Sequence, residues 1–277
     1  MITREVHINS LTIGGSRSLV LLAGPCVIEG EEVTLRIAGR IKEVASSIGM
    51  GLIFKSSYDK ANRSSIHSYR GPGLEEGLRI LRRVKEELDL PVVSDVHRFE
   101  EIEKASAVLD VIQVPAFLCR QTDFIVEVAK AGKPINIKKG PFLAPWDMRN
   151  VIEKVTSTGN ENLLLTERGT TFGYNNLVSD MRSLVIMRSF GYPVVYDATH
   201  SVQLPGAGGD RSGGQRELVP HLAKAATATG IDALFMEVHE DPSRALCDGP
   251  NSLCLDEVSC LLTQVKEIDR IVKDGEP

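Results

Sequence analysis

The amino-acid sequence predicts an α/β fold, a (β/α)8 TIM barrel, because short apolar segments alternate eight times with amphipathic segments along 277 residues. The apolar segments are rich in β-branched residues and apolar on both faces, as strands of a fully covered parallel sheet must be. A chain of this length can bury one large core. Since no proline-rich linker, low-complexity tract or repeat divides the sequence, we expect residues 1–277 to form a single barrel domain.

A doubly wound sheet is the alternative fold, but no GxGxxG turn follows the first predicted strand. Between the predicted strands, apolar residues recur three and four positions apart, which indicates helices with one buried face. Val33, Ile37 and Ile41 form one such stripe. The predicted strands are residues 19–23, 52–54, 92–94, 111–114, 135–137, 163–166, 194–196 and 234–237.

Residues 1–16 precede the first barrel strand and show a short apolar alternation at Val6, Ile8, Leu11 and Ile13. Alternation with a period of two indicates strands rather than a helix. We therefore expect a small N-terminal β-hairpin that caps the bottom of the barrel.

Composition and charge restrict the class of function. The net charge of -5 argues against a nucleic-acid-binding surface, which needs a broad basic face. The N-terminal residues lack a cationic region followed by an apolar run, and no stretch approaches the roughly 18 apolar residues of a membrane span. A cytoplasmic protein without a membrane partner is expected.

The five cysteines are odd in number and scattered, so reduced thiols are expected rather than a disulfide framework. Cys119, Cys254 and Cys260 lie in or beside apolar stretches and are predicted to be in the core. Cys26 instead follows the first predicted strand, where it has a second interpretation.

Polar side chains gather directly after the predicted strands, where a barrel of this type carries its chemistry. Because all eight carboxyl ends open on one face, these side chains should surround one site. They are Cys26, Lys55, Asp95, His97, Gln113, Arg120, Lys138, Lys139, Glu167, Arg168, Asp197, His200, Glu237, His239 and Asp248.

Several of these side chains predict anion binding. Residues 55–73 hold four fixed cations against one acid, Asp59, in a protein that is acidic overall. Lysine is costly to bury, so Lys55 and Lys138 at strand ends should reach water or meet an anion. Phosphate and carboxylate are the obvious anions.

Two separate cationic cradles are predicted. Arg168 offers a planar fork suited to bidentate phosphate binding, and Arg63 with Ser64 offers a second cradle that is rich in hydroxyl groups. Two cradles indicate two anionic substrates. The alternative is that each cation forms an ordinary surface salt bridge, but the occurrence of the whole set at matching strand ends favours a site.

A second group of candidate site residues has the side chains of a metal site. Cys26, His200, Glu237 and Asp248 follow the first, seventh and eighth predicted strands, which become neighbours when a barrel closes. A thiolate, an imidazole and two carboxylates suit Zn2+, Fe2+ or Mn2+ better than Mg2+ or Ca2+. The alternative is that Cys26 is a buried apolar thiol, since free cysteine commonly packs in cores.

Three further features have weaker interpretations. Residues 205–214 (PGAGGDRSGG) lack the GxxxxGK[ST] arrangement, and they are interpreted as a mobile lid rather than a nucleotide loop. Residues 169–176 (GTTFGYNN) form a polar turn that is either structural or directed at substrate. Trp146 is expected to be a packing residue at the start of a helix.

Four longer motifs resemble one enzyme family. They are residues 60–65 (KANRSS), 115–123 (PAFLCRQTD), 165–176 (LTERGTTFGYNN) and 197–206 (DATHSVQLPG). The chain resembles the 3-deoxy-D-manno-octulosonate 8-phosphate synthases, also called 2-dehydro-3-deoxyphosphooctonate aldolases, from about the first strand to the last helix. The resemblance implies a barrel enzyme that condenses phosphoenolpyruvate with D-arabinose 5-phosphate and water, releases phosphate and supplies the Kdo sugar of lipopolysaccharide.

The resemblance also implies roles for individual residues. Lys55, Lys60, Lys138 and Arg168 should hold phosphoenolpyruvate, with the backbone of Ala116 near its phosphate. The pentose phosphate should be bound by a second set, which consists of Asn62, Arg63 and Ser64 with Arg120 from a neighbouring subunit of a homotetramer. Asp95 and Gln113 complete the expected substrate site, and Lys60, Lys138, His200 and Asp248 are the expected catalytic residues.

The family has metal-dependent and metal-independent branches, and the latter carries asparagine where this chain has Cys26. The resemblance therefore implies one divalent metal ion held by Cys26, His200, Glu237 and Asp248, which either orients the aldehyde and water or lowers the pKa of bound water. Residues 247–250 (CDGP) look more like the metal-independent branch, so the signature is mixed.

Two other functions stay open at this point. The related 3-deoxy-D-arabino-heptulosonate 7-phosphate synthases use erythrose 4-phosphate, but they usually carry a Pro-Arg-Thr type sequence where this chain has residues 62–65 (NRSS). A non-catalytic sugar-phosphate sensor on the same barrel is the alternative from another class. The presence of all the expected polar site residues argues against a sensor.

Overall fold

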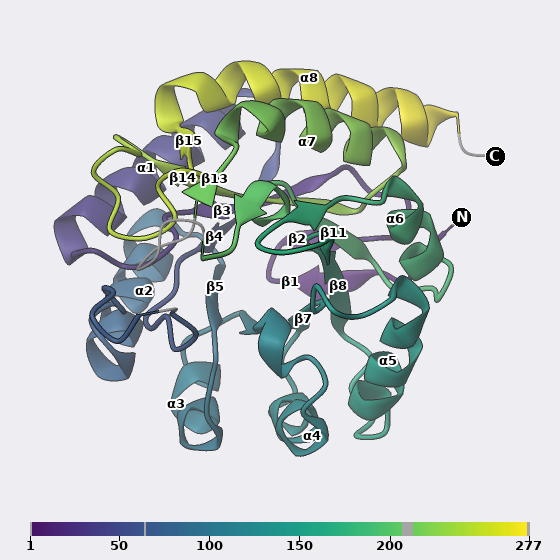
Figure 1. The fold of residues 1–277 in the computed structure, drawn as a ribbon, viewed down its shortest axis with the longest axis horizontal. Coiled ribbons are helices and arrows are strands. Elements are labelled where there is room, and N and C mark those ends of the chain that lie inside the picture. Colours follow the sequence, from purple (N-terminus) through teal and green to yellow (C-terminus); the bar gives the residue numbers. More distant parts are fainter. Residues whose placement is uncertain (1, 64, 207–212, 276–277) are drawn as a thin grey trace.

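The computed structural model describes residues 2–63, 65–206 and 213–275, which fold into a closed barrel of parallel strands with helices around it (Figure 1). The barrel strands are β3 (Val20–Gly24), β4 (Gly51–Lys55), β5 (Val92–Asp95), β6 (Val111–Val114), β7 (Ile135–Lys138), β8 (Leu163–Glu167), β11 (Val194–Asp197) and β14 (Ala233–His239). Consecutive strands pair in this order, and β14 closes the ring by pairing with β3 as well as β11. The predicted (β/α)8 barrel is confirmed.

Six barrel strands extend one residue beyond their predicted ends, and in all of them except β3, which gains Gly24, the extra residue is charged. Lys55, Asp95, Lys138, Glu167 and Asp197 end β4, β5, β7, β8 and β11. All five side chains are buried. The hydrogen-bonded ladder continues through these residues because each charge meets a partner inside the barrel mouth.

Helices cover the outside of the barrel, and their sequences explain where they lie. In the helix from Leu74 to Leu88, for example, Leu78, Leu81 and Val84 are buried against the strands. The described α-helices are α1 (Glu31–Ser47), α2 (Leu74–Leu88), α3 (Ile102–Ser106), α4 (Thr122–Lys130), α5 (Met148–Thr156), α6 (Met181–Arg188), α7 (Val219–Ala228) and α8 (Leu255–Asp274). Within the described part of the chain, no helix is both long and apolar enough to cross a membrane.

The N-terminal hairpin closes the amino end of the barrel, as predicted. Its strands β1 (Val6–Ile8) and β2 (Leu11–Ile13) pair antiparallel. Val6, Ile8 and Ile13 join the cluster of apolar side chains that fills the barrel interior. The interior part of that cluster consists of Val20, Leu22, Ile53, Val93, Val111, Leu164, Val195, Ala233 and Phe235.

Short additional strands lie at the opposite, carboxyl end of the barrel. β9 (Thr170–Thr171) pairs with β10 (Leu177–Val178), β12 (Gln203–Leu204) pairs with β13 (Gly213–Gly214), and β15 (Leu253–Cys254) extends β14. The segment predicted to be a lid falls largely on residues 207–212, which lie outside the described residues. That interpretation stays a prediction.

The end of β3 approaches β4 unusually closely, and Gly24 makes this possible. A Cβ atom at Gly24 would lie 2.1 Å from the backbone oxygen of Lys55, so only glycine fits. This contact brings the segment that carries Cys26 next to Lys55, whose ammonium donates a 3.1 Å hydrogen bond to the Cys26 carbonyl oxygen. The local packing therefore places a thiol beside the cationic residues of the barrel mouth.

Two sequence predictions about packing were wrong. Trp146 does stand at a helix start, in the 3-10 turn Pro145–Asp147, but 63% of its surface is exposed. Cys260 is also exposed, on the outer side of α8, whereas Cys119 is buried as expected. The prediction for Cys260 rested on its apolar neighbours in sequence, but in both cases the side chain is exposed.

A buried ion pair near the amino end should matter greatly for stability. The Arg188 guanidinium lies 3.1 Å from the Asp232 carboxylate, which also accepts a 2.8 Å hydrogen bond from the Val194 backbone nitrogen. Because removal of one partner leaves a buried charge uncompensated, Asp232→Ala should lower the free energy of unfolding by about 3–5 kcal/mol. Urea denaturation followed by circular dichroism measures this change.

Glu127→Ala is the matched control, because it breaks an exposed ion pair with Lys130. It should cost less than about 1 kcal/mol. Equal effects of the two variants would show that burial does not decide the contribution of the ion pair.

Candidate active site

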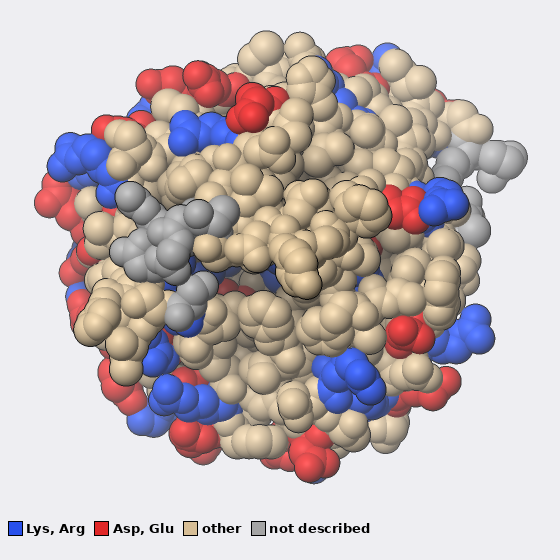
Figure 2. Space-filling model, viewed as in Figure 1, with Lys and Arg blue, Asp and Glu red and all other residues tan. Residues whose placement is uncertain are grey.

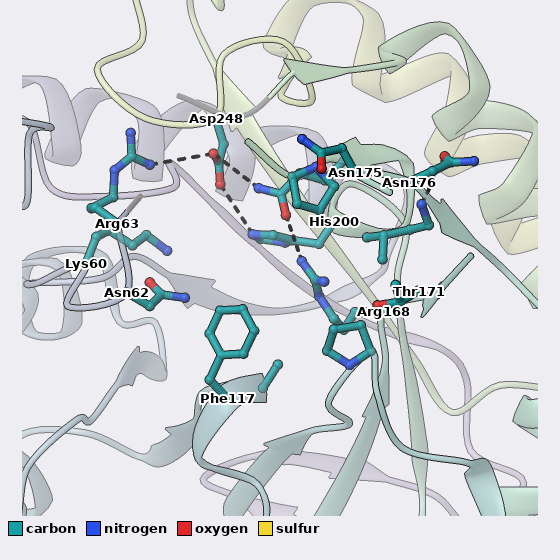
Figure 3. Close-up of a pocket in the computed structure, with 15 residues that line it drawn as sticks. Lys60, Asn62, Arg63, Phe117, Arg168, Thr171, Asn175, Asn176, His200 and Asp248 are labelled. Carbon is teal, nitrogen blue, oxygen red and sulfur yellow. Dashed lines mark hydrogen bonds and ion pairs between the residues drawn. The ribbon is translucent and has the colours of Figure 1, made fainter. Parts of the chain in front are cut away.

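A cavity of about 290 Å³ opens at the carboxyl end of the barrel. In Figure 2 most charged side chains of this face lie toward the periphery, and a few are visible inside the central hollow. Figure 3 shows the arrangement of the lining, with Lys60, Asn62 and Arg63 on one side and Arg168 on the other. The predicted site residues that line the cavity are Lys60, Asn62, Arg63, Ala116, Arg168, His200 and Asp248.

Lys60 supplies one of the buried charges in the cavity wall. Its ammonium nitrogen lies 3.6 Å from Asp95 Oδ2 and 4.0 Å from Glu237 Oε1. Burial by itself disfavours the charge, but the surrounding acidic groups, Cys26 first among them, raise the pKa of Lys60 well above its ordinary value. Lys60 is therefore a fixed cation at neutral pH.

Arg63 and Arg168 stand on opposite sides of the cavity (Figure 3). Arg63 Nη1 lies 3.7 Å from Asp248 Oδ1, and Arg168 Nη2 donates a 2.9 Å hydrogen bond to Gln203 Oε1. Gln203 Nε2 in turn lies 3.4 Å from Asp248 Oδ1. The Gln203 amide thus connects Arg168 to Asp248, the carboxylate that faces Arg63. Two guanidinium groups across one cavity suit two anionic groups of bound ligands.

Two predicted lysines, Lys55 and Lys138, lie below the cavity rather than in its wall. Lys55 Nζ lies 3.0 Å from Glu237 Oε1, and Lys138 Nζ lies 2.6 Å from Asp197 Oδ2. Both ammonium groups also face the ring of Phe235, at 5.2 and 3.9 Å from its centroid. Burial lowers the pKa of Lys138, although Asp197 partly restores it. Each lysine therefore has a carboxylate partner and adds positive potential from beneath.

Asp95 and Gln113, also predicted to bind substrate, belong to a hydrogen-bonded network under the cavity. Gln113 Nε2 donates to Asp95 Oδ1 at 2.6 Å, and Asn136 Nδ2 donates to Gln113 Oε1 at 2.9 Å. Burial would raise the pKa of Asp95, but Lys60 and the other nearby cations bring it well below the ordinary value. A permanently charged Asp95 holds Lys60 in position.

The four predicted metal ligands come together, although in two overlapping groups. Donor atoms within 4.8 Å of one another occur in His200, Glu237 and Asp248, and also in Cys26, Asp248 and the adjacent Cys247. Asp248 Oδ2 lies 3.5 Å from His200 Nε2 and 3.6 Å from Cys26 Sγ. Two donors on one tetrahedral ion are about 3.3–3.8 Å apart, so these contacts have the spacing of shared ligands.

The buried polar atoms of these residues also fit a cation. Glu237 Oε2 is buried and, within the described part of the chain, has no hydrogen-bond partner. His200 Nδ1 lies 2.8 Å from Asp197 Oδ2, which directs Nε2 toward Asp248 and Glu237. A carboxylate behind a histidine is the usual support of a metal ligand. The donor set therefore fits a divalent ion of borderline softness.

Comparison with known proteins identifies the family of the chain. The sequence profile of the DAHP synthetase I family matches residues 3–274. The chain belongs to the DAHP synthetase I family.

Several curated members of this family are similar over nearly their whole length. A protein of Geobacter sulfurreducens is 63% identical over 271 residues, which cover 98% of this chain and 100% of the relative. A protein of Trichlorobacter lovleyi is 64% identical with the same coverage. A protein of Geobacter metallireducens is 62% identical over 271 residues. All three are named 2-dehydro-3-deoxyphosphooctonate aldolase, so the resemblance predicted from the four motifs is confirmed.

Two predicted site residues, Ser64 and Arg120, are not among the described residues that line the cavity. Ser64 lies outside the described residues. Arg120 is exposed and does not line the cavity of its own chain, and its backbone oxygen accepts a 3.1 Å hydrogen bond from Lys154. An exposed Arg120 is compatible with the predicted role in a neighbouring subunit, which stays a prediction.

Sequence reasoning missed several lining residues. Thr171, Asn175 and Asn176 belong to the polar turn with two open interpretations, and all three line the cavity. Phe117 and Gln203 also line it, directly after Ala116 and three residues after His200. Proximity to predicted site residues was a usable signal for both, but neither side chain type indicates a particular chemistry by itself.

The protonation of His200 should depend on Asp197. Burial lowers the pKa of His200, but the Asp197 carboxylate outweighs it and the net shift is upward. Asp197→Asn should therefore lower the pKa of His200, as measured by NMR titration of the metal-free protein. Glu29→Gln is the matched control, because it should lower the pKa of His239, which lies 3.4 Å from Glu29, and leave His200 unchanged.

The sign of the accompanying stability change is fixed by linkage. A raised histidine pKa stabilises the folded protein below the unfolded value of about 6.5, and the contribution is lost as pH rises through the folded pKa. Asp197→Asn should reduce this pH dependence of unfolding. An unchanged His200 pKa in the variant would mean that another group sets its protonation.

Proposed function

We propose that the protein is a 3-deoxy-8-phosphooctulonate synthase, a transferase that condenses phosphoenolpyruvate with D-arabinose 5-phosphate and water and releases phosphate. The product is 3-deoxy-D-manno-octulosonate 8-phosphate, an intermediate in the synthesis of the Kdo sugar of lipopolysaccharide. The observation that carries the proposal is the cavity with cationic groups on two sides, in a chain more than 60% identical to proteins named for this product.

Phosphoenolpyruvate is assigned to the side formed by Lys60 and Arg168. Lys55 and Lys138 support it from below, where their positive charges lie close under the cavity. The backbone of Ala116 lines the same cavity and offers a contact for the phosphate. Three negative charges on a small ligand require such a concentration of cations.

The pentose phosphate is assigned to the side formed by Asn62, Arg63 and Ser64. Arg63 is largely buried yet directed toward the cavity, so its guanidinium can meet a phosphate without a large loss of side-chain freedom. Arg120 of a neighbouring subunit would add a second guanidinium at this end.

The reaction joins two anions that repel each other in water. Fixed cations on both sides position carbon 3 of the enol phosphate against the aldehyde carbon, which makes the encounter effectively intramolecular. Positive charge develops at carbon 2 as the new carbon-carbon bond forms, and water adds there. Asp95, Asp197 and Glu237 keep Lys60, Lys138 and Lys55 oriented throughout, so the field is organised before substrate arrives.

Lys60, Lys138, His200 and Asp248 are proposed as the catalytic residues. Lys60 lines the cavity as a charged donor, and Lys138, whose pKa is lowered, is the more suitable of the two lysines for moving a proton. His200 holds its Nε2 toward Asp248 at 3.5 Å, where the two side chains can orient the aldehyde and the attacking water.

A divalent ion, Zn2+, Fe2+ or Mn2+, is proposed at Cys26, His200, Glu237 and Asp248. When bound, it would supply Lewis acidity to the aldehyde oxygen or to water. The unpartnered Glu237 Oε2 and the supported His200 ring favour its presence. The thiol of Cys26 favours a borderline ion over Mg2+.

We further propose that the enzyme acts in the cytoplasm as a homotetramer. Exposed Phe142, Trp146 and Phe172 surround one apolar hollow beside the barrel mouth. Contiguous apolar surface of this kind commonly marks contacts between subunits. A contact between subunits would also give a role to Arg120, which is exposed and does not line the cavity of its own chain.

The family match also leaves 3-deoxy-D-arabino-heptulosonate 7-phosphate synthesis as a second candidate. Initial rates of phosphate release from phosphoenolpyruvate should be at least about tenfold higher with arabinose 5-phosphate than with erythrose 4-phosphate, because the shorter sugar cannot place its phosphate at Arg63 and its aldehyde at the enol phosphate at the same time. The reverse preference would support the second candidate. Calorimetric binding of the sugar phosphate without phosphate release would support a sensor instead.

Removal of metal should abolish the reaction. Protein treated with a chelator and desalted should release no phosphate, and Zn2+, Mn2+ or Fe2+ should restore the rate. Cys26→Asn, assayed together with metal analysis, tests the thiol directly. Full activity in metal-free parent protein would contradict the metal proposal while leaving the substrate assignment intact.

A further inference from the structure

Cys247, which the proposed function does not use, lies against Cys26. The two residues are 221 positions apart, and their sulfur atoms are 2.8 Å apart. Both side chains are buried, at 4% and 3% exposure. The fold thus brings the loop after β3 and the loop after β14 together so that two thiols meet at one point.

Cys247 is not an ordinary core cysteine, because its neighbours are charged. Arg63 Nη1 lies 2.8 Å from Cys247 Sγ, and the same nitrogen is 3.7 Å from Asp248 Oδ1. The sulfur therefore has a polar, cationic neighbour and faces the same residues as Asp248. The apolar neighbours of the pair within the described residues are few, namely Val27 and the partly buried Tyr69.

The Cys247 sulfur also belongs to a group of possible metal donors. Its distances to Cys26 Sγ and to an Asp248 carboxylate oxygen are below 4.8 Å, and Asp248 is shared with His200 and Glu237. One ion near Asp248 would therefore be within reach of both sulfurs after small side-chain rotations. Two thiolates that bind one ion at about 2.3 Å lie about 3.3–3.7 Å apart, so the sulfurs would separate by roughly 0.5–1 Å.

The backbone fixes the orientation of this loop. Asp248 has a left-handed φ of 49°, which is uncommon for a residue other than glycine. Its carbonyl oxygen accepts hydrogen bonds from the backbone nitrogens of Asn251 and Ser252, each at 3.0 Å, and from Ser252 Oγ at 3.1 Å. These three bonds hold the turn in the conformation that directs the consecutive side chains of Cys247 and Asp248 to the same place.

We propose that Cys247 is a further ligand of the divalent ion, which is then bound by two thiolates, Cys26 and Cys247, together with donors from His200, Glu237 and Asp248. The inference rests on the metal site of the proposed function and changes its chemistry. Two soft ligands favour Zn2+ or Fe2+ over Mn2+. A divalent charge also offsets the repulsion between two adjacent thiolates more fully than Arg63 alone does.

X-ray absorption of the zinc-loaded protein tests the ligand set directly. Two sulfur neighbours at about 2.3 Å are expected in the parent protein and one in Cys247→Ser. Cys260→Ser is the matched control, because Cys260 is exposed on α8, and it should keep both sulfurs. One sulfur neighbour in the parent, or an unchanged number in Cys247→Ser, overturns the proposal.

Metal competition gives an independent readout on the same variants. Cys247→Ser should weaken Zn2+ binding by at least about tenfold, since even outer partners of metal sites act on this scale. Its affinity for Mn2+ should change much less, because Mn2+ gains little from a thiolate. Equal losses for both ions overturn the proposal, and so does recovery of a Cys26–Cys247 disulfide peptide from the metal-loaded protein.

Phosphate release, assayed separately, distinguishes this inference from the proposed function. If the parent protein makes product but its metal has a single sulfur neighbour, the proposed function stands and the role of Cys247 as a ligand is rejected. If the metal has two sulfur neighbours but the protein makes no product, Cys247 is a ligand and the proposed function is rejected.

Discussion

The need to neutralise buried charge at the carboxyl end of the barrel determines most of the site. Parallel strands that close into a ring bring their last residues together, and in this chain five of those residues are lysine, aspartate or glutamate with buried side chains. A buried charge without a partner is too costly to keep, so each is paired across the ring, as Lys55 is with Glu237 and Lys138 with Asp197. The pairing leaves Lys60, Arg63 and Arg168 to face the cavity. Their positions follow from the carboxylates that hold them.

The carboxylates also have different partners in the two halves of the site, one around Lys60 and one around His200. Asp95 faces Lys60 and Asp197 faces His200, so one acid holds a cation in the cavity wall and another holds an imidazole ring. Glu237 stands between the two halves, close to both Lys55 and His200. This arrangement explains how many charges can be packed so tightly while the centre of the face carries little exposed charge.

The sequence predicted the barrel and most of the site because both depend on patterns that are local in the chain. Alternation predicted the strands, the strand ends located Arg168, His200 and Asp248, and the resemblance to the family indicated Lys60. What it could not predict depends on contacts between distant segments. Nothing in the sequence shows that Cys247 meets Cys26, or that Lys55 lies beneath the cavity rather than in its wall. The errors at Trp146 and Cys260 have a related cause, since an apolar neighbourhood in sequence does not determine which way a side chain faces.

The hairpin at the amino end of the barrel restricts where substrates and products can enter and leave. Val6, Ile8 and Ile13 close that end, and the barrel interior above them is filled with side chains. A passage along the barrel axis is therefore absent from the described structure, and the mouth is the way in and the way out. Both reactants must enter, and phosphate and the larger sugar acid must leave, through one doorway. A single entrance therefore constrains the order in which substrates bind and products leave, in addition to any constraint from the chemical steps.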